Sequence, residues 1–358
     1  MNGGARLLRL LAAAVMPVGV LVVVLIARAG ISAYGALLLL ALACVWLGAL
    51  SFGRRRRRGV IRAGLAAIVV LVIVRALGVQ TSAAQSVRVR DGVMRPTWLT
   101  AIVDERDPAV LAAAFLELMG ALPAADRAGM AAVLDDGYHR LAEDVGFVPT
   151  LMPVTAVREA RGDDFFMITF EVPDPVGVVV FLHGSGGPFT LPCWQVAQAA
   201  RAAGFSTWCP ATAPRAAWAD VDSGRPVVLR AVALARAHTA TGIVVGVGLS
   251  AGGIGLTAMG ADDDLDLDGV IAISGTAHQA PRARHPTLLV HGERDGMVAI
   301  DHAIALAAVD DSATLRRFDG NHFVLLQAHA AIASAVTTRL RQTTRIAFPT
   351  SPPPGASP

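Results

Sequence analysis

The chain has 358 residues, of which 54% are hydrophobic, and its mean hydropathy of +0.54 excludes an ordinary soluble protein. The net charge of +3 is carried by arginine alone, and much of the excess lies in the first 80 residues. The charge therefore says little about what the rest of the chain binds.

Three apolar segments precede residue 80, at about 8–27, 31–52 and 59–78. Each approaches or exceeds the roughly 20 residues that a helix needs to cross a bilayer. The third contains Arg62 and Arg75, but both lie near its ends, where long side chains reach the interface. We therefore predict that residues 1–78 form a transmembrane anchor of three helices.

Five consecutive arginines, Arg54 to Arg58, separate the second and third segments. Such a run can bind nucleic acid, but a short loop between spans is where cytoplasmic arginines are expected. We therefore predict no nucleic-acid partner and a multi-pass protein of the cell membrane, with everything after residue 79 on the extracytoplasmic side. Ala27 to Ala29 resemble a signal cleavage site, and cleavage there would leave this placement unchanged.

Four further regions follow the predicted anchor. Residues 79–107 are polar and are predicted to be a juxtamembrane linker, and 108–149 a pair of helices that begin near Pro108 and Pro123. Packing is the favoured role of this pair, with a spacer or part of a lid as alternatives. Residues 150–345 are the predicted catalytic domain, and the proline-rich tail 346–358 is predicted to be disordered.

From about residue 150, strands alternate with helices, which predicts an α/β fold with a mostly parallel, doubly wound sheet. The predicted strands lie at about 151–159, 165–172, 178–182, 205–209, 243–247, 269–274, 286–291 and 313–318. The predicted helices lie at about 193–203, 224–239, 250–260, 300–309 and 322–342.

The two cysteines of this domain fall at one edge of the predicted sheet. Cys193 begins a helix and Cys209 ends the next strand, and an oxidising compartment would permit them to pair. A disulfide and two buried thiols both remain possible. The third cysteine, Cys44, lies within the second predicted span.

A Gly-Leu-Ser-Ala-Gly turn, Gly248 to Gly252, follows the apolar strand 243–247 and precedes a helix. A serine on such a strand-to-helix turn is held in a strained backbone conformation, and the flanking glycines remove steric clashes. The pattern is typical of a nucleophile, so we predict that Ser250 attacks the substrate.

Two later loops supply the partners that a serine nucleophile needs, a base and a group that orients the base. Asp295 follows the strand 286–291, and His322 follows the strand 313–318. Both lie at the sheet edge where Ser250 is expected, so we predict His322 as base and Asp295 as its partner. Glu293, in the same loop as Asp295, is an alternative acid.

A glycine-rich loop, His183 to Gly187, follows the strand 178–182 and can present backbone N–H groups near Ser250. With Ala251 it would form an oxyanion hole. Ser185 is the predicted donor, with Gly184 and Gly186 as close alternatives. Aromatic side chains are predicted to line the substrate site, namely Phe189, Trp194 and Trp218, with Trp208 nearby.

Residues 150–342 resemble the α/β-hydrolase family through four motifs in order, His183 to Gly187, Gly248 to Gly252, His291 to Asp295 and Gly320 to His322. The resemblance implies the α/β-hydrolase fold and a serine hydrolase that forms an acyl-enzyme without a cofactor. Only about eleven residues, 275–285, separate two strands between which many members carry a lid. The chain is therefore similar to the compact, dienelactone-hydrolase-like branch.

Two other motifs have simpler explanations, and no metal site is predicted. Gly246 to Ala251 fits a dinucleotide-binding pattern, but no acidic residue follows at the expected place. Asp264 to Gly269 resembles the first half of a calcium loop, yet Gly275 occupies the position that requires glutamate.

These features predict a membrane-anchored serine esterase that acts on a small-molecule or lipid ester, or on a thioester. A peptidase or an acyltransferase could use the same triad. A non-catalytic interaction or sensor domain is the alternative from another class. The acyl group, the leaving group and the oligomeric state are left open.

Overall fold

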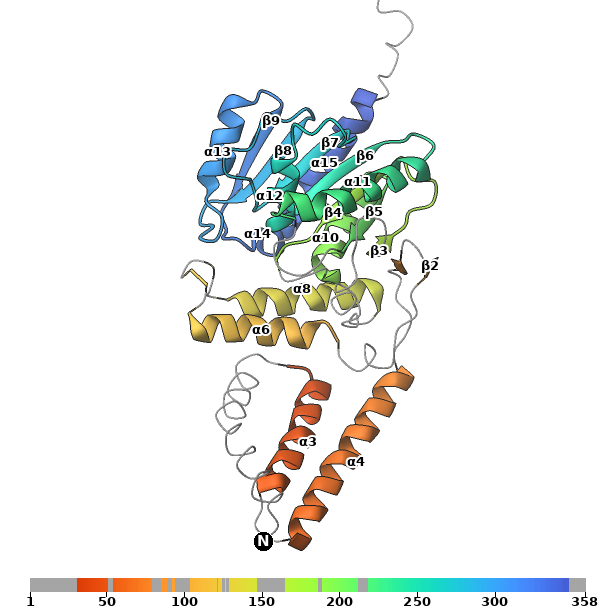
Figure 1. The fold of residues 1–358 in the computed structure, drawn as a ribbon, viewed down its shortest axis with the longest axis vertical. Coiled ribbons are helices and arrows are strands. Elements are labelled where there is room, and N and C mark those ends of the chain that lie inside the picture. Colours follow the sequence, from red (N-terminus) through yellow and green to blue (C-terminus); the bar gives the residue numbers. More distant parts are fainter. Residues whose placement is uncertain are drawn as a thin grey trace, which may run out of the picture. The chain divides into compact units, whose positions relative to one another are not determined.

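The computed structural model describes residues 31–50, 54–78, 85–88, 92–93, 104–120, 122–123, 126, 129–146, 165–185, 189–211 and 218–347 (Figure 1). The chain divides into two compact units. Unit 1 comprises Met1–Thr81, Pro96–Ala121 and Gly129–Leu151, and unit 2 comprises Ser82–Arg95, Leu122–Ala128 and Met152–Pro358. The first predicted span and the first predicted strand, 8–27 and 151–159, lie outside the described residues, as does the tail from 348.

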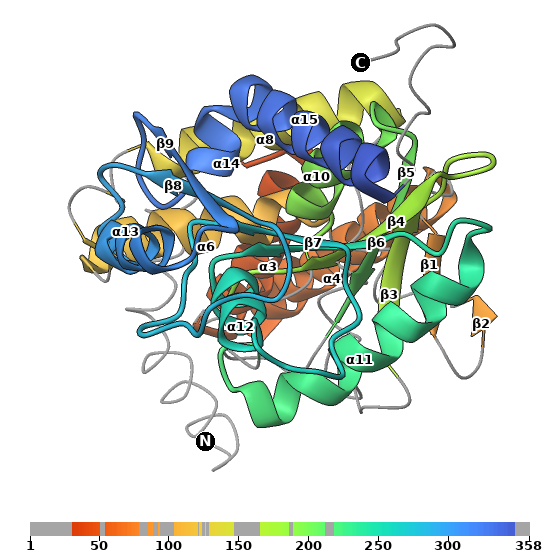
Figure 2. The same ribbon diagram turned by 90° about the horizontal axis from the view of Figure 1, so that it is seen from above.

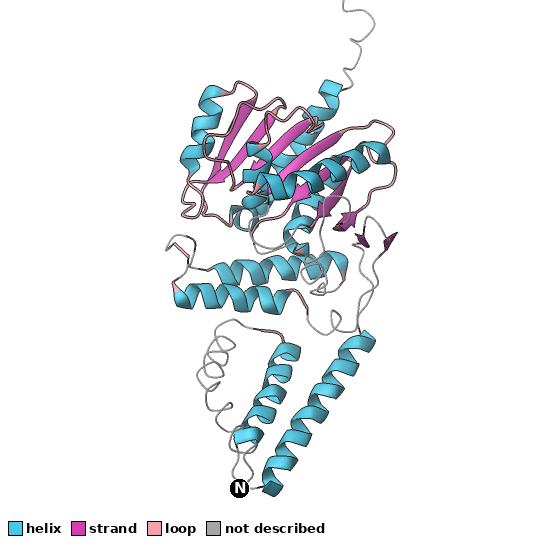
Figure 3. Cartoon of the chain, in the orientation of Figure 1, coloured by secondary structure: helices cyan, strands magenta, loops and turns pink. Residues whose placement is uncertain are grey.

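Unit 2 is built on a nine-stranded sheet, in the order β2-β1-β3-β5-β4-β6-β7-β8-β9. Figure 3 draws its strands in magenta. The strands are β1 Gln85–Arg88, β2 Gly92–Val93, β3 Phe166–Phe170, β4 Gly177–Leu182, β5 Phe205–Pro210, β6 Val244–Leu249, β7 Gly269–Ile273, β8 Thr287–Gly292 and β9 Ala313–Phe318. Six neighbouring strands are parallel to one another, namely β5, β4, β6, β7, β8 and β9. The pairs β2–β1, β1–β3 and β3–β5 are antiparallel. The predicted mostly parallel α/β sheet is therefore present.

Helices cover both faces of this sheet, which explains its continuous apolar strands. They are α10 Thr190–Arg201, α11 Val221–His238, α12 Ala251–Ala258, α13 Ile300–Val309, α14 Val324–Gln327 and α15 His329–Ala347. Figure 2 shows α11 and α12 on one face and α10 and α15 on the other. Every residue of β4 is buried, whereas the edge strand β9 has exposed positions.

Two features of unit 2 depart from the predicted elements. β1 and β2 lie within the stretch predicted to be a linker, because β1 pairs along its whole length with β3. The last predicted helix is divided at Ala328 into α14 and α15. His322 lies before α14, in a turn whose backbone bonds to a different segment of the chain.

Cys193 and Cys209 are joined by a disulfide that links α10 to β5. Their Cα atoms lie 6.2 Å apart, and both residues are buried. The other described cysteine, Cys44, is a free thiol.

The described part of unit 1 contains four helices, α3 Ala33–Leu50, α4 Arg54–Gly78, α6 Arg106–Met119 and α8 Met130–Val145. Ser32 donates its N–H and its hydroxyl to the two oxygens of Asp107, at 2.9 and 2.5 Å. None of the helices in the described ranges is both long and apolar enough to be a candidate membrane span. The transmembrane prediction for 31–52 and 59–78 thus has no support in the structure.

Candidate active site

Ser250 lies on a sharp turn between β6 and α12, with φ of 51° and ψ of −115°. This left-handed conformation is unfavourable for a residue with a side chain. The turn also requires glycine on both sides, because a Cβ at Gly248 would lie 2.5 Å from the nitrogen of Gly253. A Cβ at Gly252 would lie 2.6 Å from the carbonyl carbon of Leu182. The local sequence therefore makes the strained turn possible.

The structure brings the predicted nucleophile, base and acid into one hydrogen-bonded line. The Oγ of Ser250 lies 2.9 Å from Nε2 of His322, and Nδ1 of His322 lies 2.9 Å from Oδ2 of Asp295. A carboxylate can only accept, so Nδ1 carries the proton and Nε2 is left to accept from the serine hydroxyl. The three residues follow β6, β9 and β8 at their carboxyl ends.

The side chain of Asp295 has no exposed surface. Its Oδ1 accepts the N–H groups of Met297 and Val298 at 2.9 and 2.8 Å, and Nε2 of His291 lies 3.2 Å from Oδ2. Burial alone would raise the pKa of Asp295, but hydrogen bonds from His291 and His322 hold that pKa well below its usual range. Asp295 is therefore ionised at neutral pH. Glu293, the alternative acid, is exposed.

The loop after β4 approaches the nucleophile at Gly184. A Cβ added there would lie 3.4 Å from Cβ of Ser250, so the backbone of this loop runs directly beside the serine. Ser185 is exposed, Ala251 is the buried first residue of α12, and Gly186 lies outside the described residues. The first N–H groups of a helix have no partner within the helix, so the Ala251 end of α12 favours an anion.

His183 is the first residue of this loop and is buried, with Nδ1 2.7 Å from the carbonyl oxygen of Gly184. Its ring packs edge-on against Trp218, with centroids 5.3 Å apart. Burial lowers the pKa of His183 to about 4, although the hydrogen bond to Gly184 opposes this. His183 is therefore neutral and braces the loop.

The aromatic residues predicted to line the substrate site differ in exposure. Phe189 is half-buried, whereas Trp194 and Trp218 are 7% and 1% exposed. Trp208 is also buried, and its indole N–H donates to Glu171 at 2.8 Å. Trp194 and Trp218 thus belong to the packed interior, and their contact with a substrate stays a prediction.

One residue at the site was absent from the sequence prediction. Asp126 is fully buried and belongs to unit 2, although it lies far before the catalytic motifs in the chain. It accepts the backbone N–H of His322 at 2.7 Å and that of Gly296 at 2.9 Å. No local pattern marks such a residue, because its partners are backbone groups about 170 and 196 positions away.

No group of three or more His, Cys, Asp or Glu side chains that could hold a metal ion occurs in the described ranges. The acidic stretch that resembles a calcium loop forms ion pairs instead. Asp264 pairs with Arg225 at 2.5 Å, and Asp266 and Asp268 pair with Arg236 at 2.6 and 3.2 Å.

Neither a family model nor a curated protein matches the sequence. Solved structures do match, over about half of this chain. An esterase from Thermogutta terrifontis is 13% identical, with a TM-score of 0.41 over 53% of this chain and 98% of its own. An esterase from Butyrivibrio proteoclasticus is 14% identical, with a TM-score of 0.41 over 50% and 94%.

A putative hydrolase of the alpha/beta superfamily from Xanthomonas campestris is 23% identical, with a TM-score of 0.36 over 47% of this chain and 99% of its own. All three alignments thus span nearly the whole of the other protein. What this chain does must be inferred from the geometry around Ser250.

Proposed function

We propose that this protein is a serine hydrolase with the α/β-hydrolase fold that cleaves a carboxylic ester or thioester through an acyl-enzyme on Ser250. The observation that carries the proposal is the continuous line of hydrogen bonds from Ser250 through His322 to Asp295. The strained turn and the low pKa of Asp295 support it, since both are features of an activated nucleophile.

In the first half of the reaction, Oγ of Ser250 attacks the ester carbonyl carbon while Nε2 of His322 takes the hydroxyl proton. Asp295 stabilises the imidazolium that forms and holds the ring in place. The negative charge that develops on the carbonyl oxygen faces the N–H of Ala251 and the 184–185 loop. Loss of one such donor typically costs about 3–4 kcal/mol of transition-state stabilisation.

The tetrahedral intermediate then expels the alcohol or thiol, which receives the proton from Nε2 of His322, and the acyl group remains on Ser250. In the second half, His322 removes a proton from water, and the resulting hydroxide attacks the acyl carbon. The acid leaves and Oγ of Ser250 recovers its proton. The residues return to their starting state, and no cofactor takes part in these steps.

The test is labelling of the full-length protein, in non-ionic detergent, with a fluorophosphonate probe. Ser250→Ala should abolish labelling, together with hydrolysis of a chain-length series of p-nitrophenyl esters. Ser274→Ala is the matched control, because Ser274 is buried on a nearby loop, has φ of 49°, and its hydroxyl finds no hydrogen-bond partner in the part of the chain that the structure describes. Labelling that persists in Ser250→Ala would sink the proposal.

We also propose that unit 1 attaches the enzyme to the cell membrane, with unit 2 on the extracytoplasmic side. Large apolar side chains are exposed along α3 and α4, namely Leu37, Leu40, Leu42, Leu47, Leu65, Val69, Val70, Ile73 and Val74. Exposed apolar surface of this extent is typical of a site that contacts lipid or another protein. The arginine run from Arg54 favours a cytoplasmic position for the α3–α4 connection.

Cell fractionation tests the attachment, and a phosphatase reporter fused after residue 80, active only outside the cytoplasm, tests the orientation. We expect the protein in the membrane fraction and the reporter to be active. Recovery of the protein in the soluble fraction would refute the attachment. An inactive phosphatase reporter, together with an active cytoplasmic reporter at the same position, would reverse the orientation.

A further inference from the structure

Asp126 connects the two loops that carry the base and the acid of the proposed site. Its Oδ1 accepts the N–H of His322 itself, and its Oδ2 accepts the N–H of Gly296, the residue that follows Asp295. Asp126 has 0% of its surface exposed, so water does not compete for these bonds. One carboxylate thus sets the separation of the two loop backbones.

The loop that carries Asp295 has a glycine where Asp126 contacts it. A Cβ at Gly296 would lie 2.7 Å from Oδ2 of Asp126 and 2.7 Å from Cβ of Pro123. Only glycine therefore lets Pro123 and Asp126 approach the loop closely. The next residues of the loop, Met297 and Val298, donate their N–H groups to Asp295, so the same short turn is bonded from two sides.

The hydrogen bonds that the Asp126 carboxylate accepts are also strong ones. Hydrogen bonds to an ionised acceptor are roughly twice as strong as neutral ones, and a buried N–H that loses its acceptor bears the full cost of desolvation. A carboxylate bound to the backbone of His322 places negative charge beside the residue that becomes an imidazolium during the reaction. Asp126 therefore fixes the backbone position of the base.

We propose that Asp126 is a positioning residue of the active site, acting through His322 and Asp295. This inference rests on the proposed hydrolase function. It assigns to the segment before the catalytic motifs a part in catalysis, because a loop displacement of about 1 Å can cost on the order of 100-fold in rate.

The test is Asp126→Asn in the full-length protein. Asparagine keeps the shape of the side chain but has one carbonyl oxygen, and its NH₂ group would face an N–H donor. We expect kcat to fall by about 10- to 100-fold with KM changed less than about twofold. The low-field proton resonance of the His322–Asp295 hydrogen bond should shift or broaden, which a purely structural role would not cause.

Asp136→Asn is the matched control, because Asp136 carries the same charge at an exposed position of α8. It should leave kcat unchanged. Gly296→Ala is a second perturbation, since its Cβ would displace the same carboxylate, and it should lower kcat in the same way. If Asp126→Asn or Gly296→Ala is folded and its kcat equals that of the wild type, the inference is overturned. An inactive, unlabelled wild type would instead refute the hydrolase function.

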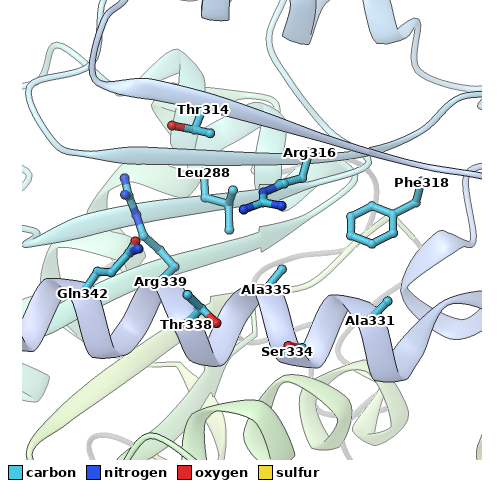
Figure 4. Close-up of a pocket in the computed structure, with 10 residues that line it drawn as sticks. All are labelled: Leu288, Thr314, Arg316, Phe318, Ala331, Ser334, Ala335, Thr338, Arg339 and Gln342. Atoms are coloured by element: carbon cyan, nitrogen blue, oxygen red, sulfur yellow. The ribbon is translucent and has the colours of Figure 1, made fainter.

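A second inference rests on a different observation, a cavity of about 350 Å³ between β8, β9 and α15 (Figure 4). Arg339 on α15 and Arg316 on β9 both line it. The Nε and Nη2 atoms of Arg339 are buried and have no hydrogen-bond partner among the described residues, and burial lowers the pKa of this guanidinium. No acidic residue of the described ranges lines the cavity, and its other lining residues are apolar or neutral, namely Leu288, Thr314, Phe318, Ala331, Ser334, Ala335, Thr338 and Gln342.

Arg339 as a whole is partly exposed, but its two buried nitrogens have lost their water without gaining an acceptor. Arginine does not give up its proton in proteins, so this loss is destabilising. An oxyanion would relieve that cost by accepting from Nε and Nη2 together, as carboxylates and phosphates do with arginine. We infer that this cavity binds a carboxylate or phosphate group, carried by a small solute or by a lipid headgroup. The site is independent of Ser250 and of hydrolysis.

Calorimetric titration of the full-length protein with inorganic phosphate tests this site. Arg339→Gln should weaken binding at least tenfold, and its melting temperature without phosphate should not fall, because an unpaired charge has been removed. Arg341→Gln is the control, since Arg341 lies on the same helix and bonds outward to the carbonyl of Ala202. If wild type and Arg339→Gln bind phosphate equally, the phosphate is an adventitious ion only, and the inference is overturned.

Titration with short-chain lipids in detergent separates the two sources of the anion, because it does not depend on attachment through unit 1. If the ligand is a headgroup, short-chain phosphatidylglycerol should bind the wild type more tightly than Arg339→Gln, whereas phosphatidylcholine should not distinguish them. Phosphatidylglycerol binding that is unaffected by Arg339→Gln, together with lost phosphate binding, assigns the site to a soluble anion.

Discussion

Replacement of Gly252 by alanine tests whether the shape of the serine turn is what activates Ser250. The added Cβ would lie 2.6 Å from the carbonyl carbon of Leu182 and 2.8 Å from its Cβ, whereas carbon atoms normally approach to about 3.5 Å. Leu182 is fully buried in β4, a central strand, and cannot give way. The turn must therefore move by about 1 Å, which corresponds to roughly a 100-fold loss in kcat/KM.

The assay is hydrolysis of p-nitrophenyl acetate by the full-length variant, with thermal denaturation in parallel. Overpacking of this kind also destabilises a fold by about 1–3 kcal/mol, so a lower Tm is expected. Gly269→Ala is the control, because its Cβ would meet its nearest neighbour, Oγ1 of Thr343, at 3.4 Å. A folded Gly252→Ala protein with the activity of wild type would refute the role of this turn.

Three further predictions concern residues around the site. Because the pKa of His183 is lowered to about 4, the unfolded chain binds the proton first, and about 3 kcal/mol of stability should disappear as pH falls from about 6.5 to about 4. Chemical denaturation across this range measures the loss, which His183→Gln should remove. Replacing both Cys193 and Cys209 with alanine should cost about 3 kcal/mol in urea denaturation, since the disulfide closes a loop with a sequence separation of 16, and an unchanged midpoint would contradict this. Asp295→Asn should lower kcat about 10³- to 10⁴-fold because Nδ1 of His322 loses its ionised acceptor, and steady-state kinetics with intact folding would show it.

Sequence patterns located the parts of the fold whose requirements are local. The apolar run at 178–182 marks β4 because a strand buried on both faces needs no polar residue. Ser250, Asp295 and His322 were predicted because each follows a strand of the parallel sheet, and parallel strands end at one edge. The polar strand β1 was missed, since its four residues form a strand only through pairing with β3.

Contacts between segments that are distant in the chain leave no such pattern in the local sequence. Gly296 could be read only as a turn glycine, yet its lack of a side chain is what admits Asp126. The sequence pattern predicted His322 at the start of one long helix. In the structure its N–H donates to Asp126, and the helix α14 begins beyond it.

The proposed active site therefore depends on two kinds of residue, which differ in how readily the sequence reveals them. Glycines such as Gly248 and Gly252 permit the strained backbone conformation of Ser250. They lie within two residues of the serine, so the requirement is visible in the local sequence. Asp126 supplies a charge to backbone groups that any sequence would present, so nothing near His322 or Gly296 specifies where the carboxylate must come from. Motifs thus delimit the chemistry of the proposed site but underestimate its extent, which includes Asp126.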